Sequence, residues 1–131
     1  MRPNAYPKRV RLRRRSDFTR VMRRQQKAVG RHLVVLIAPR RSGPARLGVT
    51  VGLRVSKSSP RRHQLKRWVV ECFRTSLQQR LVSVDLLVVF RRDFPRAGHG
   101  HLLAELERLV EPALAAPALW QRGRRPRRRR R

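Results

Sequence analysis

Acidic residues are scarce in this chain. Its 131 residues include 7 Asp and Glu against 35 Lys and Arg, which gives a formal net charge of +28. The acids are scattered, and the sequence contains no carboxylate pair, glycine-rich phosphate loop, or serine or cysteine nucleophile motif. An enzyme that carries its own chemistry needs convergent acids, bases or metal ligands. We therefore expect no catalytic residue in the protein itself.

Histidine offers one candidate metal site. His99 and His101 form an HGH sequence ahead of the last helical pattern, with no acid beside them. Such a pair is a candidate for metal binding, but a helix cap or a surface position explains it more simply. Three of the acids, Glu105, Glu107 and Glu111, fall in that last helix, where we interpret them as solvated residues that balance Arg108.

Cysteine and long apolar runs are also nearly absent. The single Cys72 cannot form a disulfide or a cysteine-based metal site within the chain, and its place in an apolar pattern favours a core position. No apolar run approaches the ~20 residues of a transmembrane helix, and the basic N-terminus lacks the apolar segment of a secretory signal. We expect a cytoplasmic protein with no membrane partner.

Arginine is what the chain has in excess. A compact protein with such a charge repels itself, and the imbalance is usually tolerated because a polyanion neutralises it. The planar guanidinium suits bidentate phosphate contacts and stacking on bases. Nucleic acid is therefore the expected partner.

The two ends of the chain differ from its middle. Residues 122–131 read RGRRPRRRRR, with eight arginines, a composition that cannot bury a core. Pro117 marks where the last helix ends. We assign residues 1–10 to a basic arm, 11–115 to one folded domain and 116–131 to a disordered tail.

The middle alternates between helical and strand patterns. The predicted elements are a short helix from Ser16, strands at 32–39, 45–53 and 84–91, a helix at about 62–80, and a last helix from about 100. The order is α, β, β, α, β, α, with room for one further strand before the long helix. We predict an α+β domain, a two-layer α/β sandwich in which that helix is a βαβ crossover between parallel strands. The general rule makes such a crossover right-handed.

The crossover helix is unusually basic. The stretch RRHQLKRWVVECFR, residues 61–74, carries five positive charges. At about 100° per residue, one side is apolar and consists of Leu65, Trp68, Val69, Cys72 and Phe73. His63, Arg67 and Arg74 project near the opposite side. We expect the Trp68 side to pack on the sheet and the Arg67 side to face solvent or a ligand. A solvated face is the usual reading of such a pattern.

Three stretches together resemble a known family. They are RLRRRSDFTRVMRR, RLGVTVGLRVSKSSPRRHQLKRWVVECFR and VDLLVVFRRDF, and they lie within residues 11–111. They are similar to the protein component of bacterial ribonuclease P, which removes the 5′ leader from precursor tRNA. The residues that match the signature helix of the family are Arg62, Leu65, Lys66, Arg67, Glu71, Phe73 and Arg74. His63, Gln64 and Val70 depart from it, and the helix wheel places Val70 within the basic face, where it has no explanation.

The resemblance implies a fold and a division of labour. It implies the ribosomal protein S5 domain 2-like fold, with a left-handed crossover. It also implies that the RNA subunit performs the hydrolysis with Mg²⁺ held mainly by RNA, while one protein helps one catalytic RNA to bind precursor tRNA. The basic helix would face the catalytic RNA, and a cleft between the sheet and the first helix would hold the leader.

Phe18 matches the aromatic residue of that cleft. Base stacking on such a ring tolerates any sequence and contributes ~1–3 kcal/mol per base. A core position is an equally good explanation of Phe18 on its own. Val34 or Leu33 stands where the family often has another aromatic residue, so this cleft would depend more on charge.

The predicted RNA-binding residues are Arg11, Arg13, Arg14, Phe18, Arg54, Lys57, Arg61, Arg62, His63, Gln64, Lys66, Arg67 and Arg74. Two other interpretations stay open on the sequence. A ribosomal or other structural RNA-binding protein would have similar basic ends. A DNA-binding protein could place the basic helix in a major groove, although only Gln64 there suits adenine.

Overall fold

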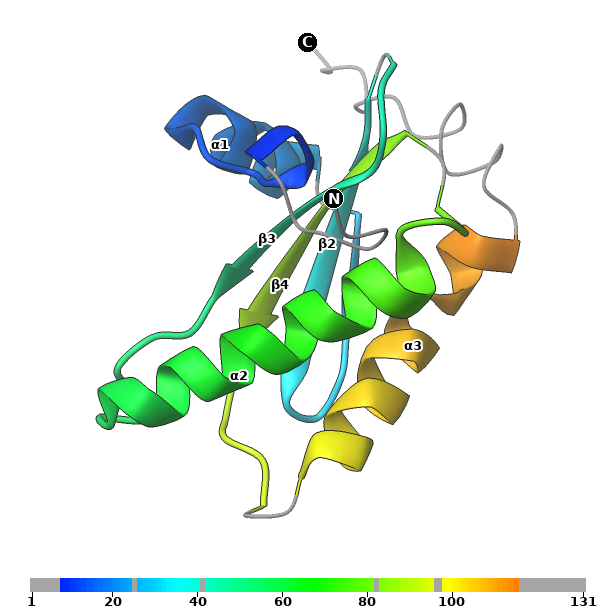
Figure 1. Ribbon diagram of the computed structural model, residues 1–131. Helices are drawn as coiled ribbons and strands as arrows, with labels where there is room; N and C mark the ends of the chain where they lie inside the picture. The colour runs from blue at the N-terminus through cyan, green and yellow to red at the C-terminus, as the bar shows by residue number, and fades with distance from the viewer. Residues whose placement is uncertain (1–7, 25, 41, 82, 96–97, 116–131) are drawn as a thin grey trace, which may run out of the picture.

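The helices and strands follow the predicted order. The computed structural model describes residues 8–24, 26–40, 42–81, 83–95 and 98–115. The elements are η1 (Lys8–Val10), α1 (Arg15–Arg24), β1 (Lys27–Val29), β2 (Leu33–Pro39), β3 (Arg46–Thr50), α2 (Ser59–Cys72) with its π-helical extension η2 (Phe73–Leu77), β4 (Val84–Phe90) and α3 (His99–Ala115) (Figure 1). This order confirms the α+β class.

Two strands differ from the prediction. β1 is the further strand for which the pattern left room; its three residues are too few to show an alternation of apolar and polar side chains. The second predicted strand, 45–53, is β3, which ends at Thr50. Leu53, the last residue of the predicted strand, lies in the following turn and is 65% exposed, so the predicted end of this strand is wrong.

The strands form one mixed sheet in the order β1-β2-β4-β3. β2 pairs antiparallel with both β1 and β4, while β3 and β4 are parallel, as expected of strands joined by a crossover helix. In Figure 1, α2 lies in front of the sheet, both parallel strands point downward, and β4 lies to the right of β3. The crossover is therefore left-handed, as the resemblance implies and against the general rule.

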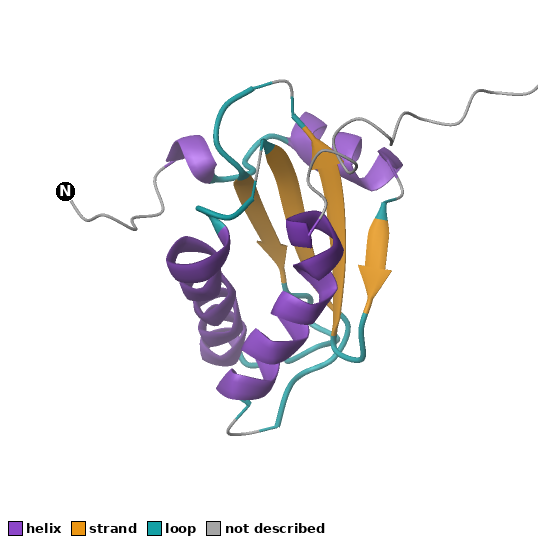
Figure 2. Cartoon of the chain, turned by 90° about the vertical axis from the view of Figure 1, so that its right-hand side faces the viewer, coloured by secondary structure: helices purple, strands orange, loops and turns teal. Residues whose placement is uncertain are grey.

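Both faces of the sheet are apolar, because alternate side chains of each strand point to opposite sides. Leu33, Val35 and Ile37 of β2 belong to the main core with α2 and α3. Leu36 and Ala38 face the other way and form a second cluster with Val21 of α1. The sheet with α2 and α3 makes the two-layer sandwich, and α1 covers part of the outer face (Figure 2).

α2 begins at a well-formed cap and buries a broad side. The Ser58 side chain accepts a hydrogen bond from the Arg61 amide at 3.2 Å, and a proline stands in the first turn. Its core residues are Leu65, Val69, Cys72 and, in the extension, Phe73. Val70 also packs against the main core, so its predicted place in the basic face is wrong. Because α2 contacts α3 as well as the sheet, its apolar arc is wider than one stripe.

The N-terminal side of the domain reaches further than residue 11. Val10, which the sequence analysis placed in the basic arm, is fully buried in the main core. Arg11 pairs in parallel with Leu47, and the Leu12 amide donates to the Leu47 carbonyl at 2.9 Å. The residues of the predicted arm before position 8 and the predicted tail lie outside the described residues.

Glu105 ties α3 to the start of β2. It is 6% exposed, and it accepts hydrogen bonds from the His32 and Leu33 amides at 2.7 and 2.8 Å and contacts the His32 ring nitrogen at 2.8 Å. Gly30 makes room, since an added Cβ there would lie 2.5 Å from Glu105 Oε2. The interpretation of Glu105 as a solvated residue is wrong. Burial acts to raise the pKa of Glu105, but the hydrogen bonds outweigh it and the pKa is lowered.

We predict that Glu105 makes the fold sensitive to acid. Because its folded-state pKa is lowered, the stability that it contributes is present above the ordinary value of 4.5 and is lost as the pH falls through the lowered pKa. Urea unfolding at pH values from about 3 to 7 should show a decline for the wild type below that value and a flatter profile for Glu105→Gln. Glu107→Gln, at an exposed position of the same helix, is the control and should follow the wild type. Parallel profiles for all three proteins would contradict this role.

Candidate RNA-binding surfaces

The outward side of α2 carries three of the predicted residues. His63, Lys66 and Arg67 are exposed, on the side of the helix away from buried Leu65 and Val69. The fold holds their backbone positions fixed relative to one another. A polyanion can therefore meet these side chains without ordering the chain that carries them.

Arg61 is held by the protein itself. Its Nε lies 3.0 Å from Asp93 Oδ1, its NH1 donates to Gln64 Oε1 at 2.6 Å and its NH2 donates to the Phe94 carbonyl at 3.2 Å. The guanidinium also lies 5.1 Å from the centre of the Trp68 ring, a cation–π distance. Arg61, one of the predicted RNA-binding residues, thus anchors α2 to the segment after β4, and Gln64, another of them, holds its guanidinium from within the helix.

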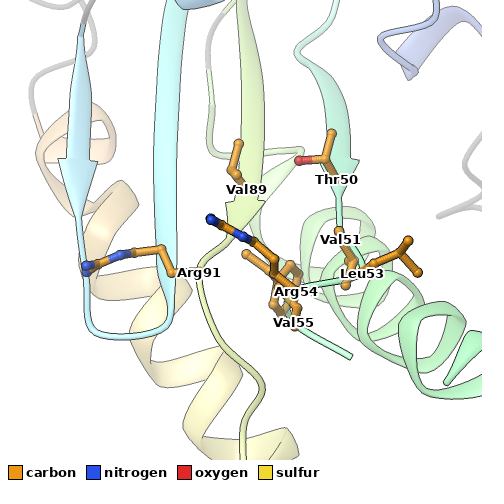
Figure 3. A pocket seen from close by; sticks show the side chains of 9 residues that line it. Thr50, Val51, Leu53, Arg54, Val55, Val89 and Arg91 are labelled. Atoms are coloured by element: carbon orange, nitrogen blue, oxygen red, sulfur yellow. The ribbon is translucent and has the colours of Figure 1, made fainter. Parts of the chain in front are cut away.

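The loop that leads into α2 borders a pocket. The hollow has a volume of about 620 Å³ and is lined by the ends of β3 and β4 and by the turn between Val51 and Val55 (Figure 3). Arg54 brings positive charge to it, and Leu53 is exposed there. The Arg91 side chain points away from the hollow, and its NH1 donates to the Gly30 carbonyl at 2.7 Å. Lys57 is exposed farther along the same loop, and Arg62 donates to the Ser56 carbonyl at 2.9 Å, which fixes the loop to the helix.

Phe18 lies on α1, on the side of the sheet opposite α2. The ring is half-buried and packs against the second cluster, beside Val34 and Val89. Gly48 allows this close approach, because an added Cβ would lie 3.1 Å from Phe18 Cε1. Phe18 is therefore partly a core residue and partly available. Of the two candidate strand positions, Val34 shares this face, whereas Leu33 is fully buried in the main core.

The remaining predicted residues lie apart from these groups. Arg11, Arg13 and Arg14 are exposed just before α1. Arg74 lines a small hollow of about 220 Å³ together with Cys72 and His99. Cys72 is a buried core residue, as predicted, and burial raises the pKa of its thiol to about 11.

The histidine pair does not build a metal site in the described part of the chain. His99 lies edge-on to Trp68, at 5.1 Å between ring centres, and 3.9 Å from Glu71 Oε1. His101 is exposed. No cluster of three or more His, Cys, Asp or Glu residues suited to a metal ion occurs among the described residues, and none of their helices is long and apolar enough to cross a membrane.

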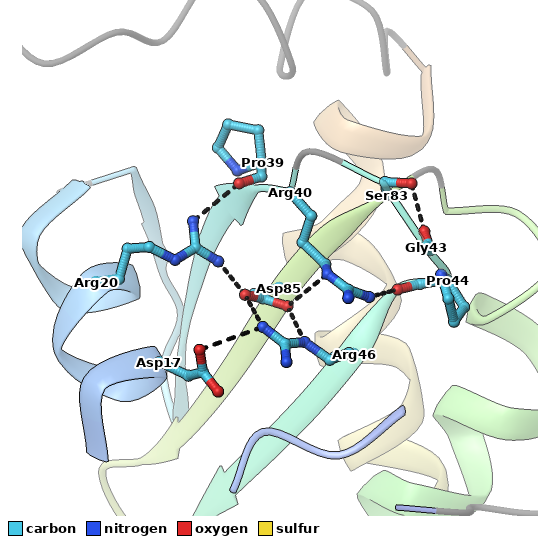
Figure 4. A network of polar contacts seen from close by, with 9 residues as sticks. All are labelled: Asp17, Arg20, Pro39, Arg40, Gly43, Pro44, Arg46, Ser83 and Asp85. Atoms are coloured by element: carbon cyan, nitrogen blue, oxygen red, sulfur yellow. Dashed lines mark hydrogen bonds and ion pairs between the residues drawn. The ribbon is translucent and has the colours of Figure 1, made fainter. Parts of the chain in front are cut away.

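A polar network at the far end of β4 escaped the sequence analysis. Asp85 is fully buried and accepts hydrogen bonds from Arg46 Nε and NH2 at 2.7 and 2.8 Å and from Arg20 (Figure 4). Arg40 Nε lies 3.7 Å from it. The hydrogen bonds to Asp85 raise the pKa of Arg46. The available signal was an aspartate inside an otherwise apolar strand, VDLLVVF.

Comparisons with known proteins point to one family. The family described as Ribonuclease P matches residues 6–114. The ribonuclease P protein component of Photorhabdus laumondii is 30% identical over 119 residues, 90% of each chain, and that of Ralstonia pickettii is 34% identical over 93 residues, 71% of this chain and 66% of the relative.

Solved structures agree with this. The RNase P protein of Thermotoga maritima is 28% identical, with a TM-score of 0.57 over 86% of this chain and 96% of that one. The RNase P protein of Staphylococcus aureus has the same fold, with a TM-score of 0.70 over 79% of this chain and 94% of that one, at 21% identity.

We predict that Arg61 stabilises the fold and that its neighbour on the outer side of α2 does not. Arg61→Ala should lower the free energy of unfolding by about 1–2 kcal/mol, because the Asp93 carboxylate and the Phe94 carbonyl lose their donor. Lys66→Ala removes the same charge from an exposed position and should stay within about 0.5 kcal/mol of the wild type. Urea unfolding followed by circular dichroism measures both. Equal stabilities would show that the Arg61 contacts are dispensable.

Proposed function

The chain belongs to the ribonuclease P protein family, and we propose that it binds the catalytic RNA through α2 and the 5′ leader of precursor tRNA on the α1 side of the sheet. Family membership makes it a tRNA-processing protein subunit of the ribonuclease P complex that associates with ribonuclease P RNA. The alternatives of a structural RNA-binding protein and of a DNA-binding protein do not account for that match.

One observation carries the assignment of the two surfaces. His63, Lys66 and Arg67 project from α2, on one side of the sheet, whereas Phe18 lies on α1, on the other side. One RNA cannot easily cover both surfaces, but two RNAs can hold the domain between them. The rigid cationic surface suits a folded RNA backbone, and the half-buried ring suits the bases of a single strand.

The chemistry belongs to the RNA subunit in this proposal. Among the described residues, no group of three or more His, Cys, Asp or Glu could hold a metal ion, and we derive no step through a protein-held Mg²⁺. In this proposal, Mg²⁺ is held mainly by the RNA. The contribution of the protein is cationic. Lys and Arg side chains at RNA phosphates replace counterions, which lowers the magnesium that the RNA needs. One protein acts with one catalytic RNA, in the cytoplasm where precursor tRNA is processed.

The cleft depends on shape and charge more than on aromatic stacking. Val34 packs against the same cluster as Phe18, where the family often has a second aromatic residue, so Phe18 supplies one ring on this face among the described residues. Stacking is tolerant of sequence, since each base has a π-face. Such a ring, with exposed Arg13 and Arg14 just before α1, suits an enzyme complex that accepts many different leaders.

We predict that assembly with the catalytic RNA depends on α2. Holoenzyme is reconstituted with Lys66→Ala/Arg67→Ala protein, RNA of the same organism and precursor tRNA at low magnesium and roughly physiological salt. The double variant should need about tenfold more protein for half-maximal cleavage, because two fixed phosphate contacts are lost. Lys27→Ala/Arg108→Ala removes the same charge from exposed positions on β1 and α3 and should behave as the wild type.

Deletion of residues 122–131 tests whether cations held on α2 matter more for assembly than the number of positive charges in the chain. It removes eight arginines and should flatten the dependence of log affinity on log salt more than the double variant does, since each lost single-strand phosphate contact removes ~0.7 from the slope. Cleavage at moderate salt should persist. If this deletion abolishes cleavage while the double variant retains it, α2 is an ordinary solvated surface.

We predict that Phe18 recognises the leader. Phe18→Ala should weaken binding of precursor tRNA to the holoenzyme about five- to a hundredfold, in line with the loss of one stacked base, and leave mature tRNA unchanged. Phe18→Tyr keeps a ring and should retain most of the affinity. Equal weakening for both RNAs, together with a lower melting temperature, would make Phe18 a core residue.

A further inference from the structure

Three arginines surround a pocket at the start of β4, at the opposite end of that strand from the pocket of Figure 3. Arg20 comes from α1, Arg40 follows β2 and Arg46 opens β3. Together with Ser42 they line a hollow of about 500 Å³. Figure 4 shows the three arginines around Asp85. None of these residues belongs to the surfaces assigned above to the catalytic RNA or to the leader bases.

The carboxylates nearby do not balance these arginines. Asp85 binds Arg46 and Arg20, with Arg40 Nε at 3.7 Å, and Asp17 Oδ1 lies 3.4 Å from Arg46 NH2. Among the described residues of this network, three guanidinium groups thus face two carboxylates. A carboxylate has about four lone-pair positions, and Asp85 already accepts three hydrogen bonds at them. One positive charge is left over in the hollow.

The excess charge is concentrated on Arg40. Arg20 and Arg40 also donate to the Pro39 and Pro44 carbonyls, which holds both guanidinium groups at the rim of the hollow. Burial, and then repulsion from Arg46, lower the pKa of Arg40. Each guanidinium has five N–H donors, more than these contacts use. An oxyanion in the hollow would relieve the repulsion and occupy the remaining donors.

We propose that Arg20, Arg40, Arg46 and Ser42 form a binding site for one phosphodiester group of a single-stranded RNA. Guanidinium groups bind phosphate oxygens through paired, charge-assisted hydrogen bonds. Asp85 acts as a positioning residue, because it holds Arg20 and Arg46 side by side. Arg20 is 39% exposed along its side chain, so the site is open to solvent on the α1 side.

The location of the arginine site suits a single strand of RNA that also passes Phe18. Arg20 and Phe18 both belong to α1, and the Phe18 ring lies against Gly48 of β3, where an added Cβ would be 3.1 Å from Phe18 Cε1. Arg46 is two residues before Gly48 in the same strand, about 7 Å along it. A single strand that stacks a base on Phe18 can therefore place a neighbouring phosphate at the arginines. The site itself needs only RNA and does not depend on the ribonuclease P assignment.

The test compares two variants with the same loss of charge. Arg40→Gln removes the arginine that Asp85 needs least, so the Asp85 pairs with Arg20 and Arg46 are retained. Arg108→Gln removes an exposed arginine from α3, on the other side of the sheet. The probe is an oligouridylate of about five nucleotides, titrated into the full chain by fluorescence anisotropy at several salt concentrations. We expect Arg40→Gln to bind about three- to tenfold more weakly than Arg108→Gln, and its salt slope to be lower by ~0.7.

A gain of affinity provides the second arm. Asp17→Asn removes a carboxylate from the network and leaves the three arginines in place, so it should bind the oligouridylate more tightly than Glu107→Gln, which removes an exposed carboxylate from α3 on the other side of the sheet. A purely structural role of the arginines predicts equal affinities for these two variants. Equal affinities of Arg40→Gln and Arg108→Gln, with equal melting temperatures, would overturn the proposal.

Inorganic phosphate distinguishes RNA from a free anion. Phosphate should raise the melting temperature of the wild type and of Arg108→Gln above that in chloride of equal ionic strength, and should not do so for Arg40→Gln. If phosphate has this effect while the oligouridylate binds Arg40→Gln and Arg108→Gln equally, the site takes free phosphate and the RNA proposal is wrong. If Arg40→Gln melts well below the wild type, Arg40→Lys, which keeps the charge without the paired donors, replaces it in the same comparison.

Discussion

Asp85 binds guanidinium groups that come from α1, from the end of β2 and from β3, although its own strand has no other polar side chain. A buried carboxylate is tolerable only when it is paired and hydrogen-bonded. The arrangement of α1 on the outer face of the sheet therefore depends on this one carboxylate as well as on the small apolar cluster of Val21, Leu36 and Leu87. Removing Asp85 would leave three arginines facing one another across the same space.

Asp85 is one of four acids, among the seven of the chain, that tie elements of the fold together. Glu105 joins α3 to β2, Asp93 holds Arg61 and therefore the start of α2, and Asp17 supports Arg46. Several cations are thus tied into the fold, while others, such as Lys66 and Arg67, project outward on rigid elements. The large net charge is sorted into fixed cations on defined surfaces and basic segments at the chain ends. This sorting is what allows a domain of such charge to be compact before RNA neutralises it.

Periodicity was sufficient for the main elements and insufficient for the contacts between them. The apolar runs of β2 and β4 and the spacing of Leu65, Val69 and Cys72 predicted the sheet and the core side of α2. Val70 was misplaced because a helical wheel assumes one packing partner, whereas α2 has two. The roles of Glu105 and Asp85 depend on partners 73 and 65 residues away in the chain, and local patterns carry no information at that range. For the same reason the sequence does not reveal that Asp93 and Phe94 hold Arg61, whose contact with RNA stays a prediction.

The pairing of residues 11 and 12 with the outer edge of β3 also affects how copies of the protein behave next to one another. An unpaired strand edge can add a strand from another chain. Here one edge of the sheet is covered by the segment at Arg11 and Leu12, and the other is the three-residue β1, which carries exposed Lys27. Charge repulsion alone would keep free copies apart, but RNA removes that repulsion wherever it neutralises the arginines. The pairing at Leu47 and the shortness of β1 are matters of backbone geometry and persist when RNA neutralises the charge, so they limit edge-to-edge pairing between copies crowded onto RNA.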